Sequence, residues 1–182
     1  GEQAVESISV AMTAHVVLMI LAFVFLFPAG ASAPLARLAC PARVRNALTW
    51  FPTWINVHKA VQSTAVVLAV AGMIPGFVAV ADDGSPHLTD PHHILGLTLV
   101  IGAVVQLTNG WLRPHVTKPP TVERRVWYQG HRLLALFVVA GGLANCVVGA
   151  SESLPDYANS AESYVFAGSV ITTSATAFAT TI

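Results

Sequence analysis

Apolar residues form long uninterrupted runs along this chain, and the charged residues are confined to the ends of those runs. Five stretches contain no Asp, Glu, Lys or Arg, and they cover residues 7–36, 60–81, 91–112, 133–151 and 163–182. A helix needs about 20 apolar residues to cross the hydrocarbon core of a bilayer. We therefore predict an all-α integral membrane bundle of five transmembrane helices, near residues 10–29, 55–80, 91–112, 127–149 and 163–182.

The five predicted helices form a single domain over residues 1–182, in which the first four helices make the core. The fifth is the most polar, because Ser and Thr recur along it, and we expect it to pack against the others. The chain begins at Gly1 rather than Met and stops where the fifth helix would leave the membrane. We therefore expect a piece of a longer protein with an upstream extracellular region.

The overall composition agrees with a membrane location. Only 10% of the residues are charged and 54% are hydrophobic, whereas about 25% of residues are charged in a typical soluble domain. This composition excludes a disordered chain, a nucleic-acid-binding protein and an ordinary water-soluble enzyme. Membrane lipid, and not nucleic acid, is the partner that it indicates.

The charges are segregated although they sum to zero. All nine Lys and Arg residues fall on one side of the predicted bundle, and of the nine acidic residues only Glu123 falls on that side. Basic loops stay in the cytoplasm. We therefore predict that the N-terminus is outside, that loops 30–54 and 113–126 are cytoplasmic, and that loops 81–90 and 151–162 are outside.

Each of the first four predicted helices carries a histidine near the end at which it enters the membrane. Ionisable groups at membrane depth are costly and usually functional. The helices of His15 and His92 both enter from outside, so these residues form an outer pair. The helices of His58 and His131 both enter from the cytoplasm, so these residues form an inner pair. His93 is a second candidate on the third helix.

Two imidazoles at one level of a helical bundle can serve as the axial ligands of a six-coordinate haem iron. We therefore predict two haem b groups, with His15 and His92 on the outer iron and His58 and His131 on the inner iron. Zinc is the alternative metal. It prefers four ligands at one level, usually with a cysteine or a carboxylate among them, and two ligands per level suit haem better.

A second pattern is in phase with the histidines. A step of 14 residues advances a helix by about 21 Å and returns to nearly the same face, and a step of 18 returns to it fully. From His58, His92 and His131 these steps reach small or amide residues, which are Gly72 and Gly76, Gln106 and Gly110, and Asn145 and Gly149. From His15 the equivalent place holds Ala29 and Gly30. We predict that these faces let a flat porphyrin pass; ordinary tight helix packing is the alternative.

Several short motifs occur in a fixed order along the four helices. They are His15-Val-Val-Leu-Met, Phe27-Pro-Ala-Gly30, Trp54-Ile-Asn-Val-His58 with Gln62, His92-His-Ile-Leu-Gly96 with Gln106, Gly110, Arg113 and Pro114, and Trp127 through His131. This ordered set resembles the core of the eukaryotic cytochrome b561 family, over roughly residues 12–150. It is most similar to fungal members, in which the core follows an extracellular DOMON domain. The spacing to Gly96 favours His92 over His93 as the ligand.

The resemblance implies a helical bundle with two b-type haems that is prone to form homodimers. It implies electron transfer from a cytoplasmic donor, commonly ascorbate, to an outside acceptor such as monodehydroascorbate, ferric iron or a DOMON domain. Such an activity would be that of a transmembrane oxidoreductase of the ascorbate-dependent or ferric-reductase type. The membrane implied is the plasma membrane or one of the secretory pathway or vacuole.

Further residues and functions are open to more than one interpretation. Lys59 and Arg132 directly follow the inner ligands, and they either neutralise haem propionates, attract an anionic donor or anchor the helices among lipid headgroups. We interpret Trp54 and Trp127 as interfacial belt residues.

A quinone-linked b-type cytochrome subunit of a respiratory complex is the alternative function, although no helix carries two histidines about 14 residues apart. A haem-free transporter or anchor is a third class.

Overall fold

The computed structural model describes residues 9–39, 53–115, 117 and 119–153. Its described elements are all helical, and four of the resulting helices are long and apolar enough to cross a membrane. The fifth predicted helix, residues 163–182, lies outside the described residues. The elements are α1 (Val10–Met19), the π-helical segment η1 (Ile20–Leu26), α2 (Phe27–Ala39), α4 (Trp54–Asp82), α5 (Pro91–Trp111) and α6 (Val122–Ser153).

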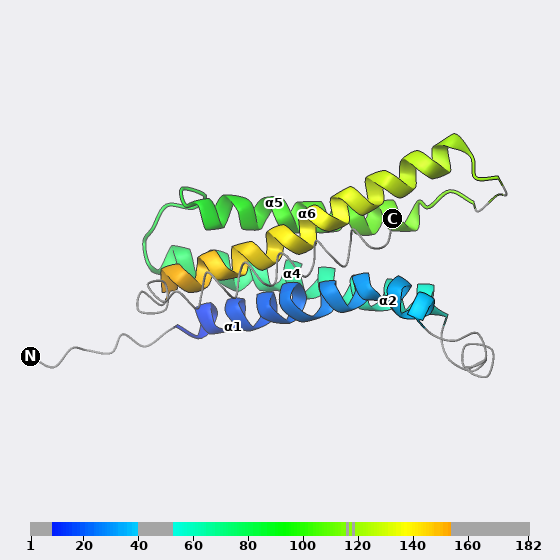
Figure 1. Ribbon diagram of the computed structural model, residues 1–182. Coiled ribbons are helices and arrows are strands. Elements are labelled where there is room, and N and C mark those ends of the chain that lie inside the picture. Colours follow the sequence, from blue (N-terminus) through cyan, green and yellow to red (C-terminus); the bar gives the residue numbers. More distant parts are fainter. Residues whose placement is uncertain (1–8, 40–52, 116, 118, 154–182) are drawn as a thin grey trace, which may run out of the picture.

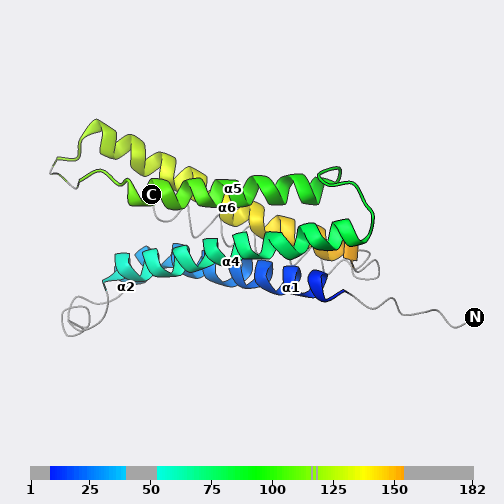
Figure 2. The same ribbon diagram turned by 180° about the vertical axis from the view of Figure 1, so that it is seen from behind.

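The helices form a four-membered antiparallel bundle (Figures 1 and 2). Elements α1, η1 and α2 follow one another without a break and together make the first long helix, which packs along α4. Helix α4 contacts α5, α5 packs along α6, and α6 returns to η1 and α2. The N-termini of α1 and α5 therefore lie at the same end of the bundle (Figure 1).

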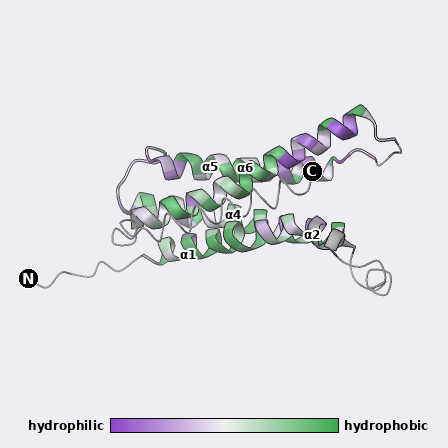
Figure 3. Ribbon diagram, viewed as in Figure 1, coloured by the Kyte–Doolittle hydropathy of each residue, from purple (hydrophilic) through white to green (hydrophobic). Residues whose placement is uncertain are grey.

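The outer surface of the bundle is apolar along its length. Phe25, Ile74, Ile101 and Leu133 come from the four different helices, and each is more than half exposed. Figure 3 shows hydrophobic residues along the middle of the helices and hydrophilic residues gathered toward their ends. Such an exposed apolar surface, bounded by polar ends, suits a hydrocarbon solvent.

Two of the helices extend well beyond the ranges predicted for them. The first continues to Ala39, ten residues past the predicted end, and α6 begins at Val122, five residues before the predicted start. The prediction placed the boundaries near the ends of the apolar runs. Charged residues such as Arg124 and Arg125 end an apolar run without ending a helix, since Arg is a good helix former.

Local capping fixes where α5 begins and hence the depth of His92. The side chain of Asp90 accepts a hydrogen bond from the backbone N–H of His92 at 2.7 Å, and Pro91 occupies the first helical position. An Asp N-cap followed by Pro is a strong helix start. Because the helix begins at Pro91, His92 lies in its first turn, at the end of the bundle to which α1 also leads.

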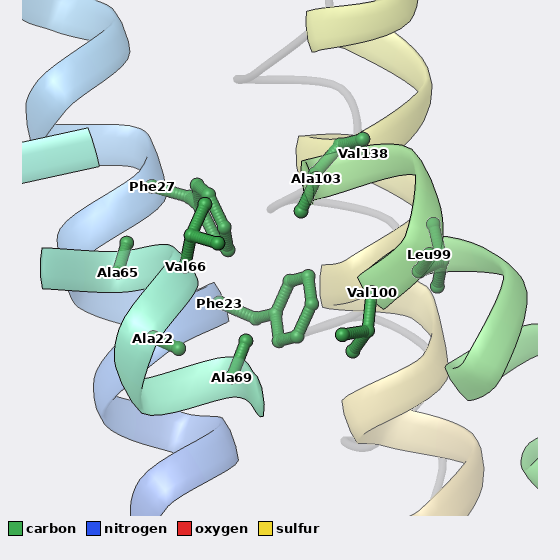
Figure 4. Close-up of a cluster of buried hydrophobic side chains, with 10 residues drawn as sticks. All are labelled: Ala22, Phe23, Phe27, Ala65, Val66, Ala69, Leu99, Val100, Ala103 and Val138. Atoms are coloured by element: carbon green, nitrogen blue, oxygen red, sulfur yellow. The ribbon is translucent and has the colours of Figure 1, made fainter. Parts of the chain in front are cut away.

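The buried core lies midway between the levels of the two histidine pairs. Ten side chains from all four helices form it (Figure 4), and they are Ala22, Phe23, Phe27, Ala65, Val66, Ala69, Leu99, Val100, Ala103 and Val138. The rings of Phe23 and Phe27 are 5.0 Å apart between centroids. Gly142 on α6 makes room for this pair, because a Cβ atom there would overlap the ring of Phe23.

We expect Gly142→Ala to lower the free energy of unfolding by about 1–3 kcal/mol, the usual cost of overpacking a close-packed core. Thermal unfolding in detergent, followed by circular dichroism, measures it. Gly130→Ala on the same helix is the matched control, since a Cβ atom there meets nothing within 4 Å. Equal melting temperatures for the two variants would contradict this account of the core.

Candidate functional site

Two pairs of imidazole rings face each other inside the bundle, at different levels. The ring centroids of His15 and His92 are 6.3 Å apart with an interplanar angle of 88°. Those of His58 and His131 are 6.4 Å apart with an angle of 62°. These are the outer and inner pairs that the sequence placed at common levels. The structure therefore brings together residues that are 77 and 73 positions apart in the chain.

The spacing within each pair suits one metal ion between the two rings. A bond from a metal to an imidazole nitrogen is about 2 Å long. Two rings that coordinate one ion from opposite sides therefore have centroids about 6 Å apart, which leaves the other positions of a haem iron to the porphyrin. Groups of three or more His, Cys, Asp or Glu suited to a metal do not occur in the described part of the chain, so a four-ligand zinc site is not formed there.

Three of the four imidazoles donate from Nδ1 to a backbone carbonyl of a neighbouring helix. His15 donates to Gly72 at 2.8 Å, His58 to Gly30 at 2.8 Å and His92 to Asn145 at 3.1 Å. A proton held on Nδ1 leaves Nε2 as the free lone pair of a neutral imidazole. Hydrogen bonds of this kind fix the tautomer and the ring orientation of a metal-binding histidine and raise its basicity.

A glycine follows two of the three acceptors, Gly72 and Asn145, by four positions. A Cβ atom on Gly76, four residues after Gly72, would lie 2.6 Å from Nδ1 of His15. A Cβ atom on Gly149, four residues after Asn145, would lie 2.5 Å from Cε1 of His92. Glycine at these two positions lets the ring lie directly against the helix backbone. Residues of the predicted small faces thus contact the histidines of neighbouring helices. Five of them also line the cavities described below, and they are Gly76, Gln106, Gly110, Asn145 and Gly149.

On the first helix, a proline and a π-helical segment allow the carbonyl of Gly30 to accept the hydrogen bond from His58. Pro34, four residues after Gly30, has no N–H to bond the carbonyl of Gly30, so that carbonyl is free to accept from His58. The acceptor is 15 residues after the ligand of its own helix, whereas on α4 and α6 it is 14 residues after it. Segment η1 lies between His15 and Gly30 and absorbs the extra residue, because each π-helical bond encloses one residue more than an α-helical bond.

The fourth imidazole, that of His131, has a different environment. Its backbone carbonyl accepts a hydrogen bond from Nε2 of Gln106 at 2.7 Å, and Gly110 would place a Cβ atom 3.6 Å from its Cε1. Its Nδ1 atom is buried and has no hydrogen-bond partner among the described residues. Instead, the indole ring of Trp127 stacks on the imidazole at 4.9 Å with an angle of 18°.

A cavity surrounds each histidine pair. The outer cavity has a volume of about 520 Å³ and is lined by His15 and His92, with Gly76, Asn145 and Gly149 at its wall. The inner cavity has a volume of about 460 Å³ and is lined by His58 and His131, among other residues. Both volumes fall in the range of roughly 300–1,000 Å³ that is typical of cofactor pockets. The histidine spacing, the free Nε2 lone pairs of His15, His58 and His92 and these volumes together fit one haem per level.

The two cavities differ in charge. The inner cavity is lined by four cationic side chains, Lys59, Arg113, Arg124 and Arg132. Three of them lie over aromatic rings: Lys59 over Trp111 at 4.6 Å, Arg124 over Trp127 at 4.6 Å and Arg132 over Tyr128 at 5.3 Å. Among the described residues that line the outer cavity there is no Lys or Arg. The potential at the inner level is therefore the more positive of the two.

The remaining predicted residues also have definite places. His93 lines the outer cavity, where its ring is 5.9 Å from that of His92 and its Nδ1 is buried without a partner among the described residues. His92, and not His93, faces His15. His87 lies against Phe77, with 5.4 Å between the ring centroids. The sequence analysis assigned no role to Pro34 or to Gly142. The position of Pro34 four residues after a glycine, and that of Gly142 in a Gly-Gly pair at mid-helix, were the signals available for them.

Comparison with known proteins gives one family and several relatives. The family model for eukaryotic cytochrome b561 matches residues 14–155. Three cytochrome b561 and DOMON domain-containing proteins of Arabidopsis thaliana are 30%, 26% and 29% identical to the chain over 136, 105 and 99 residues. These matches cover 74%, 58% and 54% of this chain but only 31%, 27% and 23% of the relatives. No solved structure matches.

The contact between Gly76 and His15 predicts an effect across helices. If each histidine pair holds a haem, as the sequence predicts, we expect Gly76→Leu on α4 to perturb the outer haem, although α4 carries a histidine of the inner pair, because the new side chain would displace the ring of His15. Gly110→Leu on α5 should perturb the inner haem through His131. Potentiometric titration of both haems measures the effects, with Gly130→Leu as the control at an open position. An effect of Gly76→Leu on the inner haem alone, or on neither, would refute this arrangement.

Proposed function

Because this chain belongs to the eukaryotic cytochrome b561 family, we propose that it carries electrons across a membrane through two bis-histidine haem b groups. The family consists of membrane-embedded b-type cytochromes, and the chain is an integral, multi-pass membrane protein. His15 and His92 are the proposed ligands of the outer haem, and His58 and His131 those of the inner haem. The observation that carries the proposal is the presence of two facing imidazole pairs, with centroids 6.3 and 6.4 Å apart.

Haem supplies a centre that gains and loses one electron without making or breaking a substrate bond. His15 with His92, and His58 with His131, would bind each haem iron from both sides and would leave it no site for oxygen or a substrate. The four histidines would hold the two haem irons, and the Nδ1 hydrogen bonds of His15, His58 and His92 would keep those three ring planes fixed. The apolar core between the two levels excludes water and ions. The protein's own contribution is thus to position and insulate two redox centres about 21 Å apart in helix rise.

The inner level is the proposed side of electron entry. The basic residues are expected to be cytoplasmic, and Lys59, Arg113, Arg124 and Arg132 line the cavity there. Such a cluster favours an anionic donor, of which ascorbate is the example implied by the family, and it also suits the propionates of the inner haem. Anchoring among lipid headgroups is compatible with either role, because the side chains of Lys59 and Arg132 lie over aromatic rings near the helix ends.

The outer level is the proposed side of electron exit. Asp82, Asp83 and Asp90 lie in or beside the loop at this end, and they favour a cationic acceptor such as ferric iron. Monodehydroascorbate and a DOMON domain are the other acceptors that the family implies. The chain spans less than a third of the length of its DOMON-containing relatives. We therefore include an upstream DOMON domain in the proposal, with a homodimer as the oligomeric state.

The proposal requires two non-covalent, low-spin haem b groups per chain. We expect a pyridine haemochrome assay, divided by protein concentration, to give a ratio near two. Carbon monoxide should leave the reduced spectrum unchanged, because both axial positions are filled by imidazole. A ratio near one, or a shift of the spectrum with carbon monoxide, would contradict the two ligand pairs.

The pairing of the ligands predicts which single variants behave alike. His15→Ala and His92→Ala should abolish the same redox component, and His58→Ala and His131→Ala should abolish the other. Optical redox titration of the four variants resolves the two components. His93→Ala should disturb the outer component less than His92→Ala does, because His93 does not face His15, and a larger effect of His93→Ala would show that His93 is the ligand. Loss of one common component in His15→Ala and His58→Ala would show that the levels are wrongly assigned.

A further inference from the structure

His131 differs from the other three paired histidines in how its ring is held. His15, His58 and His92 each donate from Nδ1 to a backbone carbonyl. The corresponding atom of His131 is buried and has no partner among the described residues. A hydrogen bond therefore does not fix the rotation of this imidazole, and another contact has to do so if the ring is to face His58 at a constant angle.

Trp127 supplies such a contact from one helical turn earlier on α6. Its indole lies nearly parallel to the imidazole, with an interplanar angle of 18° and 4.9 Å between the ring centroids. This is the offset-stacked geometry that aromatic pairs prefer. A parallel stack restricts the rotation of the imidazole about its Cβ–Cγ bond, which is the same motion that the Nδ1 hydrogen bond restricts in the other three histidines.

The indole is itself held in place by the end of α5. Nε1 of Trp127 donates to the carbonyl of Asn109 at 2.9 Å, and that carbonyl belongs to the last turn of α5, where acceptors lack intrahelical donors. The guanidinium of Arg124 lies over the indole at 4.6 Å and donates to the carbonyl of Pro114 at 3.0 Å. The indole thus connects the inner imidazole to the end of the neighbouring helix.

We propose that Trp127 is the positioning residue for His131 and takes the place of the backbone acceptor that the other three imidazoles have. This inference rests on the proposed function, in which His131 binds the iron of the inner haem. It assigns Trp127 a role beyond that of an interfacial belt residue, which would contact lipid headgroups and leave the ligand unchanged. It also makes the ligand environments of the two haems different, because only the inner haem would have a ligand, His131, whose Nδ1 makes no hydrogen bond within the described part of the chain.

The test compares Trp127→Leu, which removes the stack, with Trp127→Phe, which keeps an aromatic face. The haem content of the wild-type protein is measured first. Potentiometric titration and low-temperature electron paramagnetic resonance then follow the two haems separately, since the low-spin signal depends on the angle between the two imidazole planes. Val126→Ala is the control for general destabilisation of this end of the bundle, because Val126 precedes Trp127 on α6, is largely exposed and is not among the residues that line the inner cavity.

We expect Trp127→Leu to shift the resonance signal and the potential of the inner haem and to leave those of the outer haem unchanged. The apparent affinity of the inner site for haem should fall about two- to twelvefold, the range that one aromatic pair contributes. Trp127→Phe should restore part of both properties, and Val126→Ala should match the wild type.

Two results would overturn the inference and leave the proposed function intact. The first is a wild-type inner signal in Trp127→Leu, and the second is an equal change of both haems, which would indicate general destabilisation. A wild-type protein without two haems would instead refute the proposed function, and the inference would fall with it.

Discussion

A hydrogen bond from an imidazole to the backbone carbonyl of a neighbouring helix is the interaction on which the rest of this bundle depends. It joins the first helix to α4 in both directions, since His15 donates to Gly72 and His58 donates to Gly30, and it joins α5 to α6 through His92 and Asn145. Each bond fixes the relative depth of two helices and selects the tautomer with a free Nε2 atom. Helix register and ligand chemistry are therefore set by the same contact.

This contact also explains why small residues recur in phase with the histidines. In a membrane there is no hydrophobic driving force between helices, and close backbone approach is a main source of helix association. A ring that bonds a carbonyl must lie against the turn that follows it, so the position four residues later cannot carry an ordinary side chain. Gly76 and Gly149 meet this requirement. The buried core between the two levels, which includes Phe23 and Phe27, then has to fill the interior of the bundle but does not have to set the register of the helices.

Much of this architecture could be predicted from the sequence, because a bilayer demands long apolar runs and penalises every ionisable group inside them. The all-helical fold and the family are confirmed, and the histidine pairs lie at the levels expected from the direction of each helix. The partners of the small residues could not be predicted, since a step of 14 or 18 residues identifies a face and a depth but not the side chain opposite. The choice between Ala29 and Gly30, which depends on η1, could not be predicted either, nor could the stacking of Trp127 on His131, which depends on the end of α5.

The π-helical segment has a consequence for how the length of this chain can vary. Between His15 and Gly30 the first helix contains one residue more than the corresponding interval on α4 or α6, and Ile20–Leu26 stores that residue as a local widening of the helix. Loss of one residue from this segment would convert it to regular α-helix and leave both ends in register. The same loss from α4, α5 or α6 would turn one half of the helix by about 100° and misalign its histidine. Natural deletions of a single residue are therefore compatible with the bundle in this segment of the first helix, whereas the matching intervals of the other helices have a fixed length.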